Sequence, residues 1–62
     1  MLSENLKKAR EERGLTQKQV ADAVGVTQTA INYFENGLKI PSLPTMISLA
    51  RTLEKRIDDL ID

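Results

Sequence analysis

The chain has 62 residues, no cysteine, no histidine and a formal net charge of zero. A chain of this length forms one small domain that buries only about 60% of the surface its unfolded form exposes, so an enclosed active site has little room. Without cysteine and histidine, disulfides, thiolate metal sites and the commonest general base are excluded, and we expect no enzyme, no metal and no other cofactor.

The first predicted helix opens near Ser3, whose hydroxyl is a candidate N-cap. It should stop at Gly14, because a glycine takes a positive φ without a Cβ penalty, and Leu15 is placed to make the apolar contact that follows such a cap. Apolar residues follow at helical spacing within this segment: Leu2, Leu6 and Ala9.

The second and third predicted helices are separated by a short turn. A T-x-x-Q pattern at Thr16 forms a capping box that opens the second helix. Gly25 ends it, and Thr27 caps the third helix, which stops at the pair Asn36 and Gly37. Three strong stop signals within 25 residues therefore predict short helices and tight connections.

The fourth predicted helix follows a loop, with Ser42 as its N-cap and Pro44 in its first turn, where a missing N–H costs nothing. Its apolar residues form a wide surface suited to the centre of a bundle: Leu43, Met46, Ile47, Leu49, Ala50 and Leu53.

A fifth short helix is expected over residues 57–61. No residue of the preceding segment 53–57 readily takes a positive φ, and Arg56 stands where a serine or threonine cap is usual. Either the fourth helix runs on, or docking of Ile57 and Leu60 alone holds the turn. Nothing in the chain alternates with strand period, so residues 1–62 are predicted to form one all-α domain, a compact bundle of about five short helices.

The third predicted helix has two different faces. At about 100° per residue, Ala30, Ile31 and Phe34 fall within one arc that suits packing on the bundle. The opposite arc carries compact amide and hydroxyl groups, with Tyr33 at its edge: Gln28, Thr29, Asn32 and Asn36. Such groups both donate and accept hydrogen bonds, as reading base edges requires, and glutamine can bind adenine. A solvated helix face is the alternative, although solvated faces usually carry lysine and glutamate.

Residues 17–36 resemble the helix-turn-helix of Cro/repressor-type (XRE-like) DNA-binding domains, a family that includes phage repressors. The small Ala21 allows two helices to approach closely, and Gly25 permits the sharp turn between them. The apolar positions of the motif are also filled: Val20, Val24, Val26, Ile31 and Phe34. The resemblance extends from the first helix to Leu60 and implies a lambda-repressor-like fold with a central helix-turn-helix.

The resemblance implies roles for particular residues. The third helix would enter the major groove, with Gln28 and Thr29 as primary base readers and Asn32 and Tyr33 as further candidates; for Tyr33, packing at the helix edge is an equal alternative. Backbone phosphates would be contacted from both flanks of this helix: by Gln17, Lys18, Asn36, Gly37 and Lys39. The helix N-terminus at Gln17 favours an anion, although Gln17 is also an ordinary first-turn residue.

Two further positions follow from the same resemblance. Glu35 borders the buried face of the third helix, where an unpaired carboxylate is costly, and Arg10 matches the family partner that forms a structural ion pair with it. Leu38, beside Gly37, departs from the family, in which a basic residue is frequent there. Together with the zero net charge, this departure predicts a modest affinity for DNA.

The expected function is sequence-specific DNA binding in transcription regulation, as a repressor and as a homodimer on a near-palindromic operator. Residues 54–62 carry two basic and four acidic side chains, and residues 1–53 seven basic and five acidic ones. The acidic C-terminal segment and the net charge of zero favour an alternative function: a protein-interaction module of the same fold, such as an antitoxin-like or coactivator-like adaptor.

We expect the C-terminal residues Ile57, Leu60 and Ile61 to contact a second copy in a dimer. An equal alternative is that all three side chains close the small core of their own domain. No apolar run reaches membrane-spanning length, and the first residues lack the apolar segment of a signal peptide. The expected location is therefore the cytoplasm. No small-molecule ligand is evident in the sequence.

Overall fold

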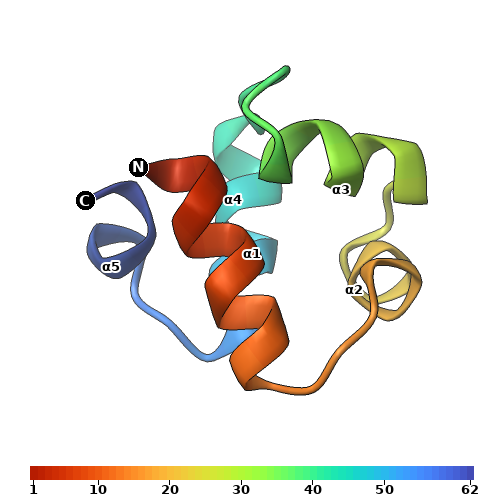
Figure 1. The fold of residues 1–62 in the computed structure, drawn as a ribbon, viewed down its shortest axis with the longest axis horizontal. Coiled ribbons are helices and arrows are strands. Elements are labelled where there is room, and N and C mark those ends of the chain that lie inside the picture. Colours follow the sequence, from red (N-terminus) through yellow and green to blue (C-terminus); the bar gives the residue numbers. More distant parts are fainter.

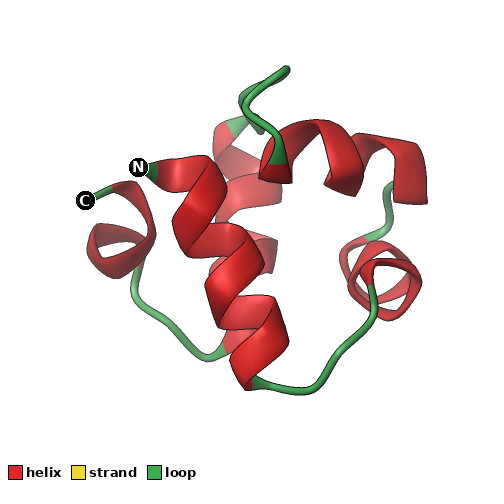
Figure 2. Cartoon of the chain, viewed as in Figure 1, coloured by secondary structure: helices red, strands yellow, loops and turns green.

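The structure is a computed structural model that describes all residues 1–62. It contains five helices and no strand: α1 (Leu2–Glu12), α2 (Gln17–Val24), α3 (Gln28–Glu35), α4 (Leu43–Leu53) and α5 (Ile57–Ile61). In Figure 1, α1 lies in front of α4, α5 flanks them on one side, and α2 and α3 flank them on the other. Figure 2 shows that short loops join these helices. The predicted all-α bundle of five short helices is confirmed.

Most helix ends follow the predicted local signals. The Thr16 hydroxyl accepts a hydrogen bond from the Gln19 backbone N–H at 3.0 Å, and the Gln19 side chain accepts one from the Thr16 N–H at 2.8 Å. Gly25 ends α2 with a φ of 82°, in the left-handed region. Ser42 caps α4, and Pro44 occupies its first turn. These ends need no tertiary contact, because the capping groups lie within the same four or five residues.

The first helix begins earlier than the sequence predicts. It starts at Leu2 rather than after a Ser3 cap, and Met1 occupies the N-cap position without a side-chain hydrogen bond. The Asn5 N–H donates to the Met1 carbonyl at 3.0 Å, which closes the first turn. Leu2 packs against the core. Leu2 is thus half-buried inside the first turn, and the Ser3 hydroxyl makes no capping hydrogen bond.

All five helices contribute to the core, α5 through Leu60 alone. Its residues are Leu6, Ala9, Val20, Ala21, Ile31, Phe34, Met46, Leu49, Ala50, Leu53 and Leu60. The expectation for α4 was too broad. Leu43 is 67% exposed and Ile47 is 37% exposed, so only part of its wide apolar surface faces the core. No other helix covers the outer side of α4, and these two side chains remain at the surface.

The turn between α4 and α5 decides between the two alternatives that the sequence left open. The fourth helix does not run on; it ends at Leu53, and Glu54 adopts a left-handed conformation with φ 55° and ψ 45°. It is the one residue besides the glycines with a positive φ. At the start of α5, Arg56 has no acceptor to offer, and the Asp59 carboxylate instead accepts from the Arg56 N–H at 3.3 Å. A strained turn thus replaces the glycine that the sequence lacks.

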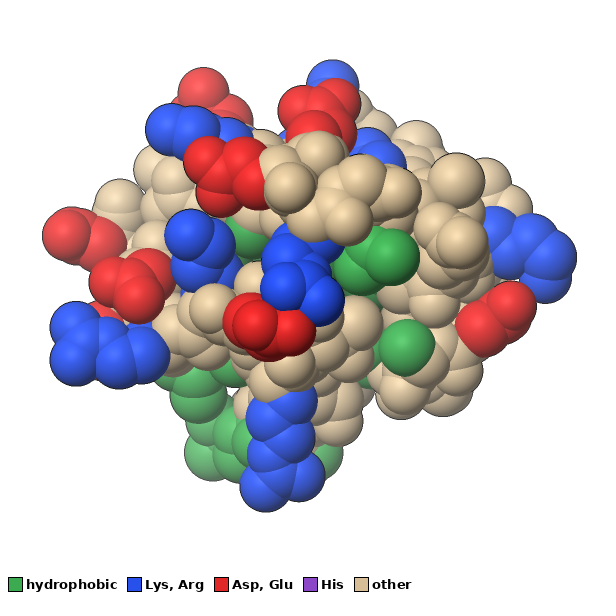
Figure 3. Space-filling view, turned by 90° about the horizontal axis from the view of Figure 1, so that it is seen from below, with side chains coloured by type: hydrophobic (Ala, Val, Ile, Leu, Met, Phe, Trp, Pro, Cys, Tyr) green, Lys and Arg blue, Asp and Glu red, His purple; other side chains and the backbone are tan.

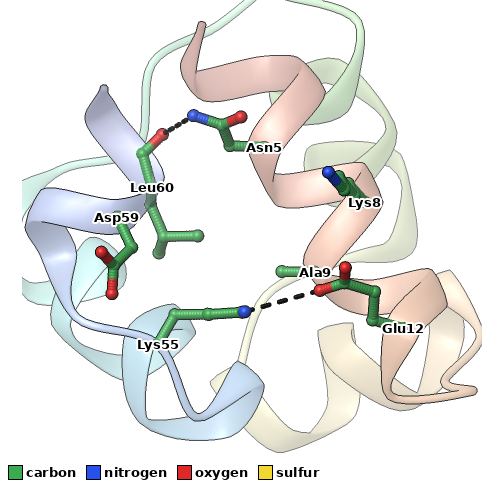
Figure 4. Close-up of a pocket in the computed structure, with 7 residues that line it drawn as sticks. All are labelled: Asn5, Lys8, Ala9, Glu12, Lys55, Asp59 and Leu60. Carbon is green, nitrogen blue, oxygen red and sulfur yellow. Dashed lines mark hydrogen bonds and ion pairs between the residues drawn. The ribbon is translucent and has the colours of Figure 1, made fainter.

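The docking of α5 onto α1 leaves a small polar groove, shown in Figure 4. The Asn5 side-chain amide donates to the Leu60 carbonyl at 2.9 Å, and the Lys55 ammonium pairs with the Glu12 carboxylate at 3.5 Å. The groove has a volume of about 160 Å³ and is lined by Asn5, Lys8, Ala9, Glu12, Lys55, Asp59 and Leu60. These contacts, together with apolar burial, hold a helix too short to be stable alone.

The C-terminal residues expected at a dimer interface divide into two groups. Leu60 is 1% exposed and belongs to the core of its own domain, so it has no surface to offer to a partner. Ile57 is half-buried and also packs against the core. The alternative reading, in which these residues close a small core, therefore holds for both. Only Ile61, which is 55% exposed, remains available for a contact between copies.

Candidate nucleic-acid interface

The orientation of α3 is fixed by the turn that precedes it. The Gly25 and Val26 N–H groups both donate to the Ala21 carbonyl, at 2.8 and 3.0 Å, which closes the end of α2. Two residues later, the Thr27 hydroxyl accepts from the Ala30 N–H at 3.1 Å and caps α3. Because Ala21 is buried and small, α2 and α3 pack closely on either side of this turn. The predicted helix-turn-helix geometry is therefore present.

The two faces of α3 differ as predicted. Ile31 and Phe34 are buried in the core, and Ala30 packs against it. The polar residues of the opposite face all lie at the surface: Gln28, Thr29, Asn32 and Asn36. Tyr33, at the edge, is half-buried. The polar face covers no other part of the domain, so its side chains are free to meet an external partner.

Three of these side chains, together with Gln17 of α2, line a shallow open hollow of about 280 Å³: Gln28, Thr29 and Asn32. None of them is charged or apolar. Each offers a compact amide or hydroxyl group able to donate and to accept. A hollow lined in this way is suited to hydrogen-bonding with a polar edge, and it has no acid, base or nucleophile pair for catalysis.

Behind this hollow, Glu35 joins three helices. The Arg10 guanidinium, on α1, donates to both Glu35 carboxylate oxygens, at 2.7 and 3.0 Å, and confirms the predicted ion pair. The Gln17 amide, on α2, donates to the same carboxylate at 3.1 Å. Arg10 also donates to the Leu15 carbonyl at 2.8 Å, in the turn before α2. The hydrogen bond from Arg10 to Glu35 raises the pKa of Arg10 above its ordinary value.

The sequence did not predict the bonds of Gln17 and Leu15 to this network. Gln17 and Glu35 are 18 residues apart, so no local pattern relates them. One N–H of the Gln17 amide is engaged with Glu35; the amide keeps its second N–H and its oxygen for another partner. The predicted phosphate contact by Gln17 therefore remains a prediction, with the side chain already held in place by Glu35.

The other flank of α3 is formed by its C-terminal turn. Gly37 has a φ of 74°, and its N–H lies 3.4 Å from the Phe34 carbonyl, a long hydrogen bond. The Asn36 side chain donates to the Asn32 carbonyl at 2.8 Å. The Lys39 ammonium lies 5.5 Å from the centre of the Tyr33 ring, a cation–π contact. Phosphate binding by Asn36, Gly37 and Lys39 remains a prediction.

Several charged side chains outside this flank form ion pairs. Lys18, on α2, pairs with Asp22 at 3.3 Å, so the charge predicted to meet a phosphate already has a partner. Figure 3 looks at the molecule from below, where acidic and basic side chains are interspersed. Arg13, after α1, pairs with Glu54, after α4, at 2.7 Å. No helix is long and apolar enough to cross a membrane, and no group of three or more metal-ligating side chains occurs.

Comparisons with known proteins agree with this geometry. The helix-turn-helix family matches residues 6–60. The chain is 39% identical over 61 residues to the HTH-type transcriptional regulator YqaE of Bacillus subtilis, covering 98% of this chain and 53% of that protein. It is 32% identical over 59 residues to the cryptic phage CTXphi transcriptional repressor RstR of Vibrio cholerae, covering 95% and 53%. The chain thus spans about half the length of these curated relatives.

Solved structures show the same fold. The restriction-modification controller protein C.AhdI from Aeromonas hydrophila superposes with a TM-score of 0.89 at 25% identity, over 95% of this chain and 89% of that one. SinR, a master regulator for biofilm formation crystallised in complex with DNA, gives a TM-score of 0.92 at 24% identity over the whole of both chains. With a family match over almost the whole chain, this protein belongs to the helix-turn-helix family, and the relatives named above are transcriptional regulators.

Proposed function

We propose that this domain is a sequence-specific DNA-binding transcriptional regulator, acting in the cytoplasm as a repressor, that reads the major groove with α3. The observation that carries the proposal is the uncharged polar hollow formed by Gln28, Thr29 and Asn32 of α3 with Gln17 of α2. Base edges in the major groove present donors and acceptors, and amides and hydroxyls match both. The names of YqaE and RstR, a regulator and a repressor, support the same class.

Within this proposal, the residues divide into readers and clamps. Gln28 and Thr29, in the first turn of α3, contact base edges, and Asn32 and Tyr33 extend the reading face along the same helix. Backbone phosphates are held on either side of this face by Gln17, Lys18, Asn36, Gly37 and Lys39. Lys18 first has to exchange Asp22 for a phosphate, which lowers the net gain from this contact.

A near-palindromic operator and a homodimer complete the proposal. Four base-reading residues on one short helix specify too few base pairs for a unique genomic site, and a two-fold repeat of the half-site doubles the readout. The half-site spacing then follows from the geometry of the pair, near one helical turn of DNA or a multiple of it.

The experiment that tests the proposal is selection of bound duplexes from a random pool by the chain itself. The expected result is an enriched sequence with two similar half-sites in opposite orientation. Binding of the selected duplex should exceed binding of a scrambled duplex by roughly 10³-fold or more at physiological salt. Recovery of random sequences at equal affinity would contradict sequence-specific recognition.

The second candidate function is a protein-interaction module of the same fold, such as an antitoxin-like or coactivator-like adaptor. Two observations favour it: the net charge of zero and the exposed apolar side chains that follow α3. A basic face usually supplies most of the affinity for DNA, and this chain has little of one. The same selection separates the two candidates, because an adaptor would enrich no sequence.

A further inference from the structure

Lys39 carries the only charge on the segment that follows α3. Residues 36–50 contain no other charged side chain. Lys39 is exposed, and none of the five ion pairs of the domain includes it. Its ammonium instead lies 5.5 Å from the centre of the Tyr33 ring. An aromatic ring attracts a cation through its electron-rich face and has no net charge, so Lys39 keeps its full charge for another partner.

The backbone also holds Lys39 beside this ring. The Tyr33 carbonyl accepts hydrogen bonds from the Leu38 N–H at 2.9 Å and, more weakly, from the Lys39 N–H at 3.4 Å. After the left-handed Gly37, both bonds turn the chain back onto the last turn of α3. Tyr33 itself is half-buried, so its ring is packed at the edge of this helix. One residue therefore anchors Lys39 twice, through its carbonyl and through its ring.

We propose that Tyr33 is the positioning residue of Lys39: its ring holds the ammonium at the C-terminal flank of α3 in the free protein, ready for a DNA phosphate. An exposed lysine side chain otherwise samples many rotamers, and ordering it on binding costs affinity. A restraint that already exists in the free protein lowers that cost. This inference rests on the proposed function, which assigns a phosphate contact to Lys39, and it gives Tyr33 a role that is exerted through Lys39 and is independent of the base sequence.

Lys18, on α2, shows why a ring differs from a carboxylate as a holder of the ammonium. The Lys18 ammonium lies 3.3 Å from the Asp22 carboxylate and has to leave it before it can meet a phosphate. The Lys39 ammonium has no ion pair to break, and its three N–H donors can turn to a phosphate while the ring stays in contact. Lys39 should therefore contribute more to the affinity for DNA than Lys18 does.

The test in the free protein uses the NMR chemical shifts of the Lys39 side chain. Protons that lie over an aromatic ring are shifted upfield by its ring current, so the ε protons of Lys39 should resonate upfield of those of the other lysines. Tyr33→Phe is the matched control, because it keeps the ring and removes only the hydroxyl, and the shift should remain. In Tyr33→Leu, which keeps an apolar side chain, the shift should disappear. Lys39 shifts that are the same in all three proteins would overturn the proposal.

The test on DNA measures the affinity for the scrambled duplex, to which base reading contributes nothing, at several salt concentrations. Tyr33→Leu should weaken binding about 2–5-fold, as for an exposed cation–π contact, and should lower the salt slope towards that of Lys39→Ala. Tyr33→Phe should bind this duplex as wild type does. Lys39→Ala should cost less in the Tyr33→Leu background than in wild type, because the two side chains act together.

Two results on DNA would overturn the proposal. Independent losses from Tyr33→Leu and Lys39→Ala would show that Tyr33 does not act through Lys39. A loss in Tyr33→Phe as large as that in Tyr33→Leu, confined to the selected duplex, would make Tyr33 a base reader alone. If the chain binds neither duplex, the proposed function fails and the phosphate clamp with it, and the chemical shifts of Lys39 still decide whether the ring holds the ammonium.

Discussion

Glu35 is the residue on which the position of the recognition helix depends. It is 8% exposed, and burial of a carboxylate is costly unless charge and hydrogen bonds compensate. Arg10 supplies two hydrogen bonds and the opposite charge, and Gln17 supplies a third bond. One side chain thus fixes α3 relative to α1 and to the start of α2. The hydrogen bonds of Glu35 therefore also fix the relative positions of α2 and α3, the two helices that line the polar hollow.

We predict that either alanine substitution, Arg10→Ala or Glu35→Ala, lowers the free energy of unfolding by up to about 3–5 kcal/mol, because each leaves an uncompensated and largely buried charge. The double substitution should cost less than the sum of the two single ones. Urea unfolding of the four proteins measures this coupling. Strictly additive losses would show that the two side chains do not interact.

The role of Lys39 is testable through its dependence on salt. If its ammonium contacts a phosphate, Lys39→Ala should weaken binding to every sequence alike and reduce the slope of log K against log salt by about one unit. Lys8→Ala is a suitable control, since Lys8 lines the groove between α1 and α5 and lies outside the proposed interface. A changed sequence preference with an unchanged slope would instead identify Lys39 as a base reader.

At the scale of single helices, the least favourable backbone conformation lies between α4 and α5. Glu54 takes a left-handed conformation that strains a residue with a Cβ, and glycine at this position would remove the strain. We predict that Glu54→Gly raises the free energy of unfolding by about 0.5–1 kcal/mol, after the entropic cost of glycine. Thermal or urea unfolding gives the value.

The control for this prediction is Glu54→Gln, which keeps the Cβ and removes the charge that pairs with Arg13 at 2.7 Å. Both side chains of the pair are substantially exposed, so the control should change stability by less than about 1 kcal/mol. If Glu54→Gly were no more stable than Glu54→Gln, backbone strain at this turn would be negligible.

The helices themselves were largely predictable, because most of their ends depend on neighbouring residues. Thr16, Gly25 and Ser42 act within one turn of the chain, and the structure confirms all three. The predicted Ser3 cap was wrong, since α1 starts at Leu2, which packs against the core. Of the two alternatives for the turn before α5, the structure has the docked one, which holds Glu54 in a conformation that its own preference disfavours. Neither effect is visible in a local pattern.

At the scale of the whole molecule, the sequence predicted the polar face of α3 but not what surrounds it. Helical periodicity places Gln28 and Asn32 on one face. It cannot say that Gln17 faces Glu35 across the motif, because that distance depends on how α2 and α3 pack. For the same reason, it could not distinguish the buried Leu49 of α4 from the exposed Leu43. Contacts between helices supplied the remaining information.

The distribution of charge also belongs to this scale. The net charge is zero, and Lys18 of the helix-turn-helix already forms an ion pair with Asp22. Long-range electrostatic attraction to DNA is therefore weak. Specific contacts from α3 then have to supply a larger share of the binding free energy than in a strongly basic domain. A single reader on α3 should consequently have a large effect on discrimination between sites.

The central claim, that α3 reads bases, is tested most directly by the affinity of wild type and Gln28→Ala for the selected duplex and for a scrambled one. Gln28 is exposed in the first turn of α3 and lines the polar hollow, so its loss leaves the core intact. We predict that Gln28→Ala loses about 1–3 kcal/mol on the selected duplex, as for a bidentate base contact, and almost nothing on the scrambled one. The preference at one base pair of each half-site should relax as well. An equal loss on both duplexes, or no loss on either, would contradict base reading by Gln28.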